Sequence, residues 1–281
     1  MEGLIIKNIS NDYVINSNNK SYICKPRGKF RKDKITPLVG DYVTFDDDNN
    51  YILNIHTRKN SLIRPSVANI DNALIVTSVK EPNLDTNLLD KLLTIISYNN
   101  IEPIICFTKL DLLTKEERKT IDIYINYYKN IGYKVVTNER VSNFNNLFKN
   151  KITVLTGQSG AGKSSLLNML DNNLKLKTNK ISYALNRGKH TTRHTELYQV
   201  LDGYIVDTPG FSNVDFHNMT KEDIRHNMKE IFNYSHECKY KDCTHIKEDK
   251  CKIKELVQEG IILSSRYNNY KNFIESLNSK Y

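Results

Sequence analysis

The sequence has no apolar run approaching the roughly 18 residues that a membrane-spanning helix needs. The first ten residues, Met1 to Ser10, also lack the long apolar region and the small-residue cleavage site of a secretory signal. Five cysteines in 281 residues argue against a disulfide framework, and 11 glycines with 6 prolines exclude a collagen. These absences predict a globular chain without a membrane partner, which we expect to stay in the cytoplasm.

The chain is long enough for two domains, or for three small ones, with a buried core. Lys and Arg total 41 against 32 Asp and Glu, and the net charge of +9 favours an anionic partner. The densest basic cluster, residues 25–34, consists of Lys25, Arg27, Lys29, Arg31, Lys32 and Lys34, with Asp33 as its one acid. Either a solvated loop or a contact with a phosphate backbone would explain this cluster.

Three patterns follow one another along the chain. Residues 1–65 contain short β-rich runs between Asn, Asp, Gly and Pro, which predict a small all-β barrel. Residues 66–218 alternate apolar strands with helices, including one over 84–97 and another opened by a capping box at Thr114, which predicts an α/β domain with a largely parallel sheet. Residues 219–281 are mainly helical around a cysteine cluster, and we expect their core to be separate from the α/β core.

A phosphate-binding loop is the strongest chemical signal. Residues 157–164 read G-x-x-x-x-G-K-S between an apolar strand and a helical run. Glycines in such a loop let backbone N–H groups and the helix N-terminus point at a phosphate. We expect Lys163 to reach the β and γ phosphates and the Ser164 hydroxyl to bind Mg²⁺. The residues assigned to nucleotide binding here are Gly157, Gln158, Ser159, Gly160, Ala161, Gly162, Lys163, Ser164 and Ser165.

Two further strand ends indicate which nucleotide binds. Asp207-Thr208-Pro209-Gly210 follows the strand 204–206, and we expect Asp207 beside Mg²⁺ and Gly210 near the γ-phosphate. Thr108-Lys109-Leu110-Asp111 follows the strand 104–107, with Thr108 where the common N-K-x-D motif has Asn. The Asp111 carboxylate can accept two hydrogen bonds from guanine, and adenine offers neither donor there. The sequence therefore predicts GTP, with Thr108, Lys109 and Asp111 at its base.

The order of these motifs is unusual for a GTPase. Asp111 precedes Gly157 by 46 residues, whereas the phosphate loop ordinarily comes before the base-reading motif. The motifs need only meet at the carboxyl ends of neighbouring strands, and domain termini often lie close enough to be joined. The α/β domain is therefore predicted to be circularly permuted.

The permuted order and four segments together resemble the small-ribosomal-subunit-dependent, circularly permuted GTPase family. The segments are Arg64-Pro65-Ser66-Val67-Ala68-Asn69-Ile70-Asp71, residues 157–165, Gly188-Lys189-His190-Thr191-Thr192 and residues 207–211. The resemblance covers nearly the whole chain and implies an OB-fold barrel over 1–65, a GTPase domain over 66–218 and a zinc domain over 219–281. It implies action late in maturation of the small ribosomal subunit, subunit-stimulated GTP hydrolysis, and an RNA-binding role for the basic cluster. Residues 136–138 read Val136-Thr137-Asn138, where the family usually has a Ser-Ala pair. The residues of the guanine-stacking loop are therefore not assigned.

Four residues near the C-terminus are candidate zinc ligands. Cys238, Cys243, His245 and Cys251 lie within fourteen residues, and three thiolates with one imidazole can close a tetrahedron around zinc. The family resemblance places ligands at these same four residues. With four protein ligands the zinc would be structural. His236 is a competing ligand, and a set of reduced surface cysteines is the alternative to a metal site.

The catalytic water lacks its usual partner. Phe211 follows Gly210 where a Ras-like GTPase has a water-orienting Gln, so another group must hold the water. His190 lies in the segment that resembles switch I, and both imidazole chemistry and the resemblance point to it. Thr191 or Thr192 should complete the Mg²⁺ shell. The alternatives for His190 are an exposed loop residue or a catalytic group supplied by the ribosome.

The leading hypothesis is a monomeric enzyme that hydrolyses GTP, uses Mg²⁺, carries one structural Zn²⁺ and binds the small ribosomal subunit and its ribosomal RNA. One alternative is a nucleotide-gated RNA-binding module whose turnover is incidental. A P-loop ATPase or small-molecule kinase is a further alternative, and it conflicts with Asp111.

Overall fold

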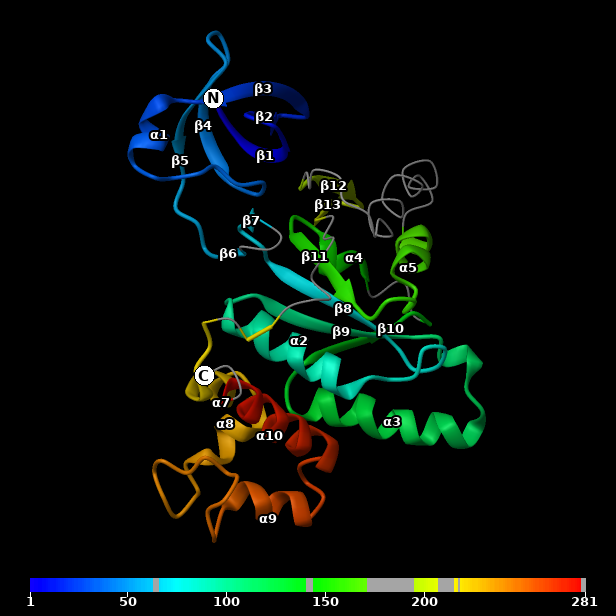
Figure 1. The fold of residues 1–281 in the computed structure, drawn as a ribbon. Coiled ribbons are helices and arrows are strands. Elements are labelled where there is room, and N and C mark those ends of the chain that lie inside the picture. Colours follow the sequence, from blue (N-terminus) through cyan, green and yellow to red (C-terminus); the bar gives the residue numbers. More distant parts are fainter. Residues whose placement is uncertain (63–65, 140–143, 171–194, 207–214, 217, 279–281) are drawn as a thin grey trace. The chain divides into compact units, whose positions relative to one another are not determined.

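The structure is a computed structural model that describes residues 1–281 except 63–65, 140–143, 171–194, 207–214, 217 and 279–281 (Figure 1). The chain divides into two compact units. The first comprises Met1–Leu74, Arg140–Thr156 and Lys163–Ser212, and the second comprises Ile75–Glu139, Gly157–Gly162 and Asn213–Tyr281. The three domains with boundaries at residues 65 and 218 stay a prediction.

A closed barrel with the strand order β1-β2-β3-β5-β4 begins the first unit and confirms the predicted OB-like fold. Its strands are β1 (Glu2–Ile9), β2 (Asp12–Ser17), β3 (Lys20–Pro26), β4 (Tyr42–Asp46) and β5 (Tyr51–Ile55). Pairing of β1 with both β2 and β4 closes the barrel. Side chains alternate between the two faces of a strand, and Ile5, Ile15, Val43, Phe45 and Ile52 are completely buried.

The basic cluster forms a short helix within this barrel segment. α1 (Gly28–Lys32) follows β3 and buries Phe30, while the six Lys and Arg side chains of residues 25–34 are exposed. The sequence did not predict this helix, because its five residues are too few for a periodic pattern. The basic cluster therefore includes a short helix, which buries one aromatic side chain and leaves the cations exposed.

The α/β part contains a six-stranded sheet with the order β10-β9-β8-β11-β13-β12. Its strands are β8 (Asn72–Ser78), β9 (Glu102–Thr108), β10 (Lys134–Thr137), β11 (Ile152–Gly157), β12 (Leu197–Val200) and β13 (Gly203–Val206). β10 pairs parallel with β9, and β11 with β13, whereas β12 and β13 form an antiparallel hairpin. A separate two-stranded ladder joins β6 (Ser61–Leu62) to β7 (Val67–Ala68). The predicted parallel α/β sheet is thus confirmed, with one antiparallel edge.

Local sequence signals fix the helices that accompany these strands. They are α2 (Thr86–Tyr98), a 3₁₀ turn (Leu110–Leu112), α3 (Lys115–Asn130), α4 (Asn145–Phe148) and α5 (Lys163–Leu170). Asp85 caps α2 by accepting a hydrogen bond from the Leu88 N–H. Thr114 and Glu117 form the predicted reciprocal capping box at the start of α3. None of the helices in the described ranges combines the length and hydropathy that crossing a bilayer requires.

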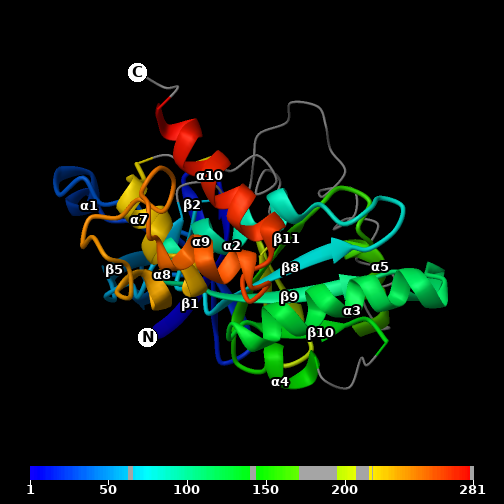
Figure 2. The ribbon, with the colours of Figure 1, turned by 90° about the horizontal axis from the view of Figure 1, so that it is seen from below.

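Four helices complete the second unit. They are α7 (Lys221–His226), α8 (Lys229–Ser235), α9 (Lys252–Gln258) and α10 (Ser264–Asn278). Two of them, α10 and α7, pack against α2. α10 lies alongside α2 in both Figure 1 and Figure 2. Ile95 of α2 belongs to the same buried cluster as Ile231, Ile253 and Phe273. Apart from Ile95, the buried members of this cluster all come from residues 216–274, so α2 contributes one side chain to it and the separate C-terminal core stays a prediction.

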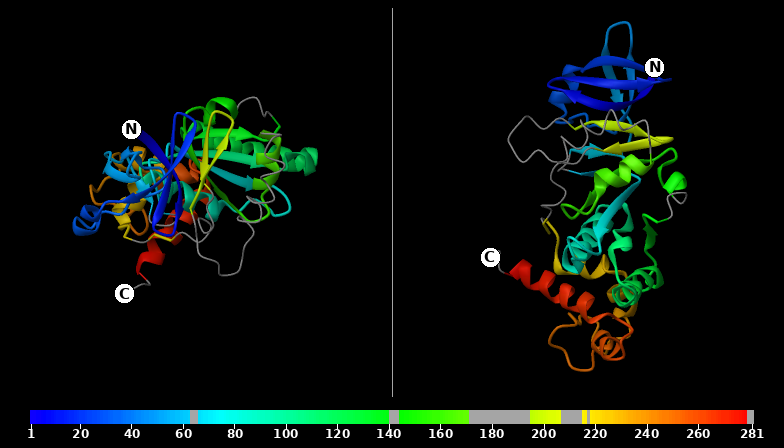
Figure 3. Two further views of the ribbon diagram at one scale, coloured as in Figure 1. Left: turned by 90° about the horizontal axis from the view of Figure 1, so that it is seen from above. Right: turned by 90° about the vertical axis from the view of Figure 1, so that its right-hand side faces the viewer.

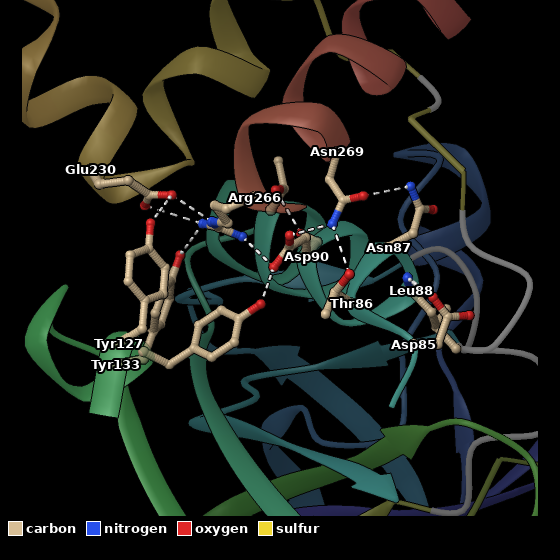
Figure 4. Close-up of polar contacts among 12 residues, drawn as sticks. Asp85, Thr86, Asn87, Leu88, Asp90, Tyr127, Tyr133, Glu230, Arg266 and Asn269 are labelled. Atoms are coloured by element: carbon tan, nitrogen blue, oxygen red, sulfur yellow. Dashed lines mark hydrogen bonds and ion pairs between the residues drawn. The ribbon is translucent and has the colours of Figure 1, made fainter. Parts of the chain in front are cut away.

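A buried ionic network lies in the second unit between α2 and the C-terminal helices (Figure 4). The Arg266 guanidinium of α10 bonds Asp90 of α2 at 2.7 Å and Glu230 of α8 at 2.5 Å, and all three side chains are essentially inaccessible. Tyr128 donates to Asp90 at 2.6 Å, and the Asn269 amide donates to the other Asp90 oxygen at 2.6 Å. Burial alone would lower the pKa of Arg266, but the Asp90 and Glu230 carboxylates raise it well above its ordinary value. The guanidinium is therefore a permanent charge that joins three helices.

Candidate nucleotide site and metal centre

The phosphate loop has the predicted context, since β11 ends at Gly157 and α5 begins at Lys163. Gly157, Gly160 and Gly162 all have positive φ, at 126°, 74° and 88°. A Cβ at Gly157 would lie 2.0 Å from the Val76 carbonyl oxygen, so no larger residue fits there. Burial lowers the pKa of Lys163. The backbone is thus shaped for a phosphate at the start of a helix.

The base-reading segment meets the phosphate loop within the second unit. The Thr108 hydroxyl lies 2.7 Å from the Ala161 carbonyl oxygen and 3.3 Å from that of Thr77. Thr108 is buried at the end of β9, and its hydroxyl donates to the loop from the position where the common motif has Asn. Lys109, with φ of +61°, donates to the Glu81 carbonyl, and Asp111 is exposed on the following 3₁₀ turn. These contacts place Thr108 directly against the phosphate loop, and Lys109 and Asp111 follow it in the chain.

A third segment supports the same loop. The chain between β8 and α2 places the Asn83 carbonyl 3.3 Å from the Gln158 side-chain amide, and Pro82 lies near Gly160. Sequence patterns did not single out this connection, because it carries no nucleotide motif. It contacts both the phosphate loop and, through Glu81, Lys109 of the base-reading segment.

Several predicted site residues lie outside the described part of the chain: His190, Thr191, Thr192, Asp207 and Gly210. Their roles stay predictions. Ser164 and Ser165 occupy the first turn of α5, with Ser164 partly buried and Ser165 exposed. Thr137 belongs to the stretch 136–138 that differs from the family's usual Ser-Ala pair. It is the last residue of β10 and pairs with Phe107 of β9, next to Thr108.

The four predicted zinc ligands converge. One ligand atom from each of Cys238, Cys243, His245 and Cys251 lies within 4.8 Å of the others. The Cys238 and Cys251 sulfurs are 3.9 Å apart, and each is 3.4 Å from Nδ1 of His245. Two sulfurs on one tetrahedral zinc stand roughly 3.8 Å apart when each Zn–S bond is about 2.3 Å. The residues therefore fit a structural Zn²⁺ held through Nδ1.

The electrostatics of this cluster also suit a cation. Burial raises the pKa of Cys243 to about 12 and lowers the pKa of His245 to about 4. The imidazole is thus neutral, as a ligand must be, and a divalent cation would compensate the buried thiolates. His236, the competing ligand, is not part of the cluster.

Glu248 organises the ligand loop, and sequence reasoning missed it. Its carboxylate accepts hydrogen bonds from the Thr244 N–H and hydroxyl and from the N–H groups of Ile246 and Lys247. Burial would raise the pKa of Glu248, but these hydrogen bonds lower it to about 2. The Tyr267 hydroxyl also donates to the His245 carbonyl at 2.7 Å. Glu248 and Tyr267, which are not themselves ligands, thus hold the backbone around His245 in position.

Phosphate loop, base-reading segment and sheet order together define a P-loop GTPase with circularly permuted motifs. The family model described as RsgA GTPase matches residues 55–217, and the RsgA N-terminal domain model matches residues 2–52. The chain belongs to the RsgA GTPase family, and it is a hydrolase acting on GTP.

Individual relatives match along the whole chain. "Small ribosomal subunit biogenesis GTPase RsgA" of Bacillus cereus is 45% identical over 287 residues, covering 99% of this chain and 98% of the relative. "Small ribosomal subunit biogenesis GTPase RsgA 2" of Oceanobacillus iheyensis is 45% identical over 290 residues, with the same coverage. The crystal structure of YloQ, a circularly permuted GTPase, matches with a TM-score of 0.84 at 37% identity, covering 100% of this chain and 96% of that one. YjeQ from Thermotoga maritima matches with a TM-score of 0.82 at 32% identity, covering 98% of both chains.

Proposed function

We propose that this protein binds the small ribosomal subunit late in its maturation and there hydrolyses GTP to GDP and phosphate, with a rate that the subunit stimulates. The names of its relatives, which describe small-subunit biogenesis GTPases, support this assignment. It acts as a monomer in the cytoplasm, where GTP occupancy sets its affinity for the subunit and hydrolysis releases it.

The observation that carries the ribosomal part is the exposed basic cluster of the barrel. Its six cations are Lys25, Arg27, Lys29, Arg31, Lys32 and Lys34, and none forms a salt bridge with another described residue. Two cations that follow β5 differ from the cluster, because Arg58 forms a salt bridge with Asp41 and Lys59 forms one with Asp71. Clustered, exposed cations that form no salt bridge among the described residues suit the phosphates of ribosomal RNA.

The chemistry at the nucleotide follows from the predicted roles. Lys163 binds the β and γ phosphates, while Ser164, Asp207 and either Thr191 or Thr192 would hold Mg²⁺, which would neutralise phosphate charge. His190 orients the attacking water. A Ras-like GTPase uses a Gln for this role, but Phe211 stands at that position here. Thr108 supports this arrangement by bonding the phosphate loop directly to the base-reading strand.

Multiple-turnover hydrolysis with purified small subunits, free 16S-type ribosomal RNA or buffer alone tests the proposal. We expect subunits to accelerate GTP hydrolysis strongly, free RNA to do so weakly, and excess ATP to leave the rate unchanged. Equal rates in all three conditions would instead indicate a nucleotide-gated RNA-binding module with incidental turnover. Competition by ATP as effective as that by GTP would refute the role of Asp111.

A further inference from the structure

The barrel contacts the β12–β13 hairpin of the sheet within the first unit. Lys7 of β1 forms an ion pair of 2.9 Å with Glu196, the residue before β12, and the two residues also share an antiparallel β-bridge. In the right-hand view of Figure 3 the yellow hairpin lies beside the blue strands of the barrel. From β2, the Asn16 amide donates to the Tyr204 hydroxyl of β13 at 3.0 Å. Both strands of the hairpin are therefore tied to the barrel.

An irregularity in β1 explains why Lys7 is available for this contact. Ile5 is completely buried, and with regular alternation Lys7 would share its face of the strand. The β1–β2 register shifts between Ile5 and Lys7, which marks a bulge. A bulge turns the following side chains to the other face, and Lys7 accordingly lies partly exposed beside Glu196.

The position of the hairpin in the chain relates this contact to the predicted catalytic segments. Glu196 follows Thr192 by four residues, and Val206, the last residue of β13, immediately precedes Asp207. The hairpin thus connects the two segments that are predicted to contact Mg²⁺ and the γ-phosphate. A displacement of the hairpin would therefore act on both segments, because the chain continues directly from the hairpin into each of them.

We propose that the Lys7–Glu196 pair is a positioning contact. Through it the RNA-bound barrel fixes the position of the β12–β13 hairpin, and with it the position of the residues that promote GTP hydrolysis. This inference rests on the proposed function, because it concerns the subunit-stimulated rate. The pair is partly exposed, with 35% and 29% of its side chains accessible, so it adds little to stability. Its effect is therefore separable from folding.

Charge reversal tests the pair. Lys7→Glu, Glu196→Lys and the double variant are compared in single-turnover GTP hydrolysis, with and without saturating small subunits. Each single reversal should lower the stimulated rate about fivefold, the size expected for losing a partly exposed pair, and the double variant should recover it. The rate without subunits and the KM for GTP should stay at wild-type values.

Two controls separate coupling from other effects. Lys134→Glu breaks the exposed Lys134–Glu102 pair of the second unit, at 2.7 Å, and should leave stimulation intact. The two single reversals change the net charge around the pair in opposite senses, so an effect on RNA affinity alone would weaken RNA binding by one variant and strengthen RNA binding by the other.

The outcomes are distinct. If wild-type protein is stimulated and both single variants are stimulated equally well, the inference is wrong. A double variant that stays as slow as the singles, or a parallel loss of the rate without subunits, also overturns it. If wild-type protein itself shows no stimulation, the proposed function fails first and removes the basis of the inference.

Discussion

Replacing Arg266 tests whether the buried network holds the C-terminal helices on α2. Arg266→Met keeps the length and apolar stem of the side chain but leaves the Asp90 and Glu230 carboxylates buried without their cation. Removing one partner of a buried pair typically costs about 3–5 kcal/mol, because the remaining charge stays desolvated. That is a large part of the roughly 5–15 kcal/mol that stabilises a domain. We expect the second unit to be severely destabilised.

Neutralising the whole network should reverse most of this loss. In the triple variant Asp90→Asn, Glu230→Gln and Arg266→Met, no charge remains buried, and such replacements are often neutral or stabilising. Arg266→Lys should give an intermediate result, because one ammonium group cannot reproduce the forked contacts to Asp90 and Glu230.

Urea unfolding followed by circular dichroism measures these differences in the zinc-loaded protein. Arg118 provides the matched control, since it also bonds two carboxylates, Asp122 and Glu139, but at the surface. Arg118→Met should cost less than about 1 kcal/mol. The reasoning is refuted if Arg266→Met is no worse than Arg118→Met, or if the triple variant is as unstable as the single one.

Four further changes address the two sites. Asp111→Asn should abolish the preference for GTP, measured by competition between unlabelled GTP and ATP, because an amide presents a donor to guanine's donors. His190→Ala should retain GTP binding yet lose roughly 10²-fold in subunit-stimulated single-turnover hydrolysis, and a wild-type rate would move the role elsewhere. Cys243→Ser should lower the zinc content from about one per chain, whereas His236→Ala should not, as elemental analysis would show. Glu248→Gln should weaken zinc retention about tenfold or more in chelator competition, because its amide cannot accept all four hydrogen bonds.

Sequence patterns predicted those features whose information is local. The phosphate loop and the capping box at Thr114 each lie within a short stretch, where spacing constrains the geometry. The four zinc ligands also lie close together in the sequence, but choosing them over His236 relied on the family resemblance as well. The permuted order was also readable, since it depends only on which motif comes first. The barrel followed from alternating β-rich runs, although α1 was too short to be recognised.

Contacts between distant residues could not be predicted in the same way. Arg266 and Asp90 are 176 positions apart, and nothing in the helical pattern around Arg266 shows that its charge is buried. Charged residues are ordinarily exposed, so a sequence interpretation assigns them to the surface. The Thr108–Ala161 contact and the Lys7–Glu196 pair likewise depend on strand order in the folded molecule. The role of His190 stays a prediction because it lies outside the described residues.

The shared core of α2 and α10 has a consequence for the order of synthesis. α2 is translated well before α10, the helix that packs against it. At about 5–20 residues per second, the 176 residues from Asp90 to Arg266 take roughly 9–35 s to synthesise. During that interval the nascent chain presents an apolar α2 surface and an uncompensated carboxylate. The second unit therefore cannot finish folding until its ribosome has synthesised α10.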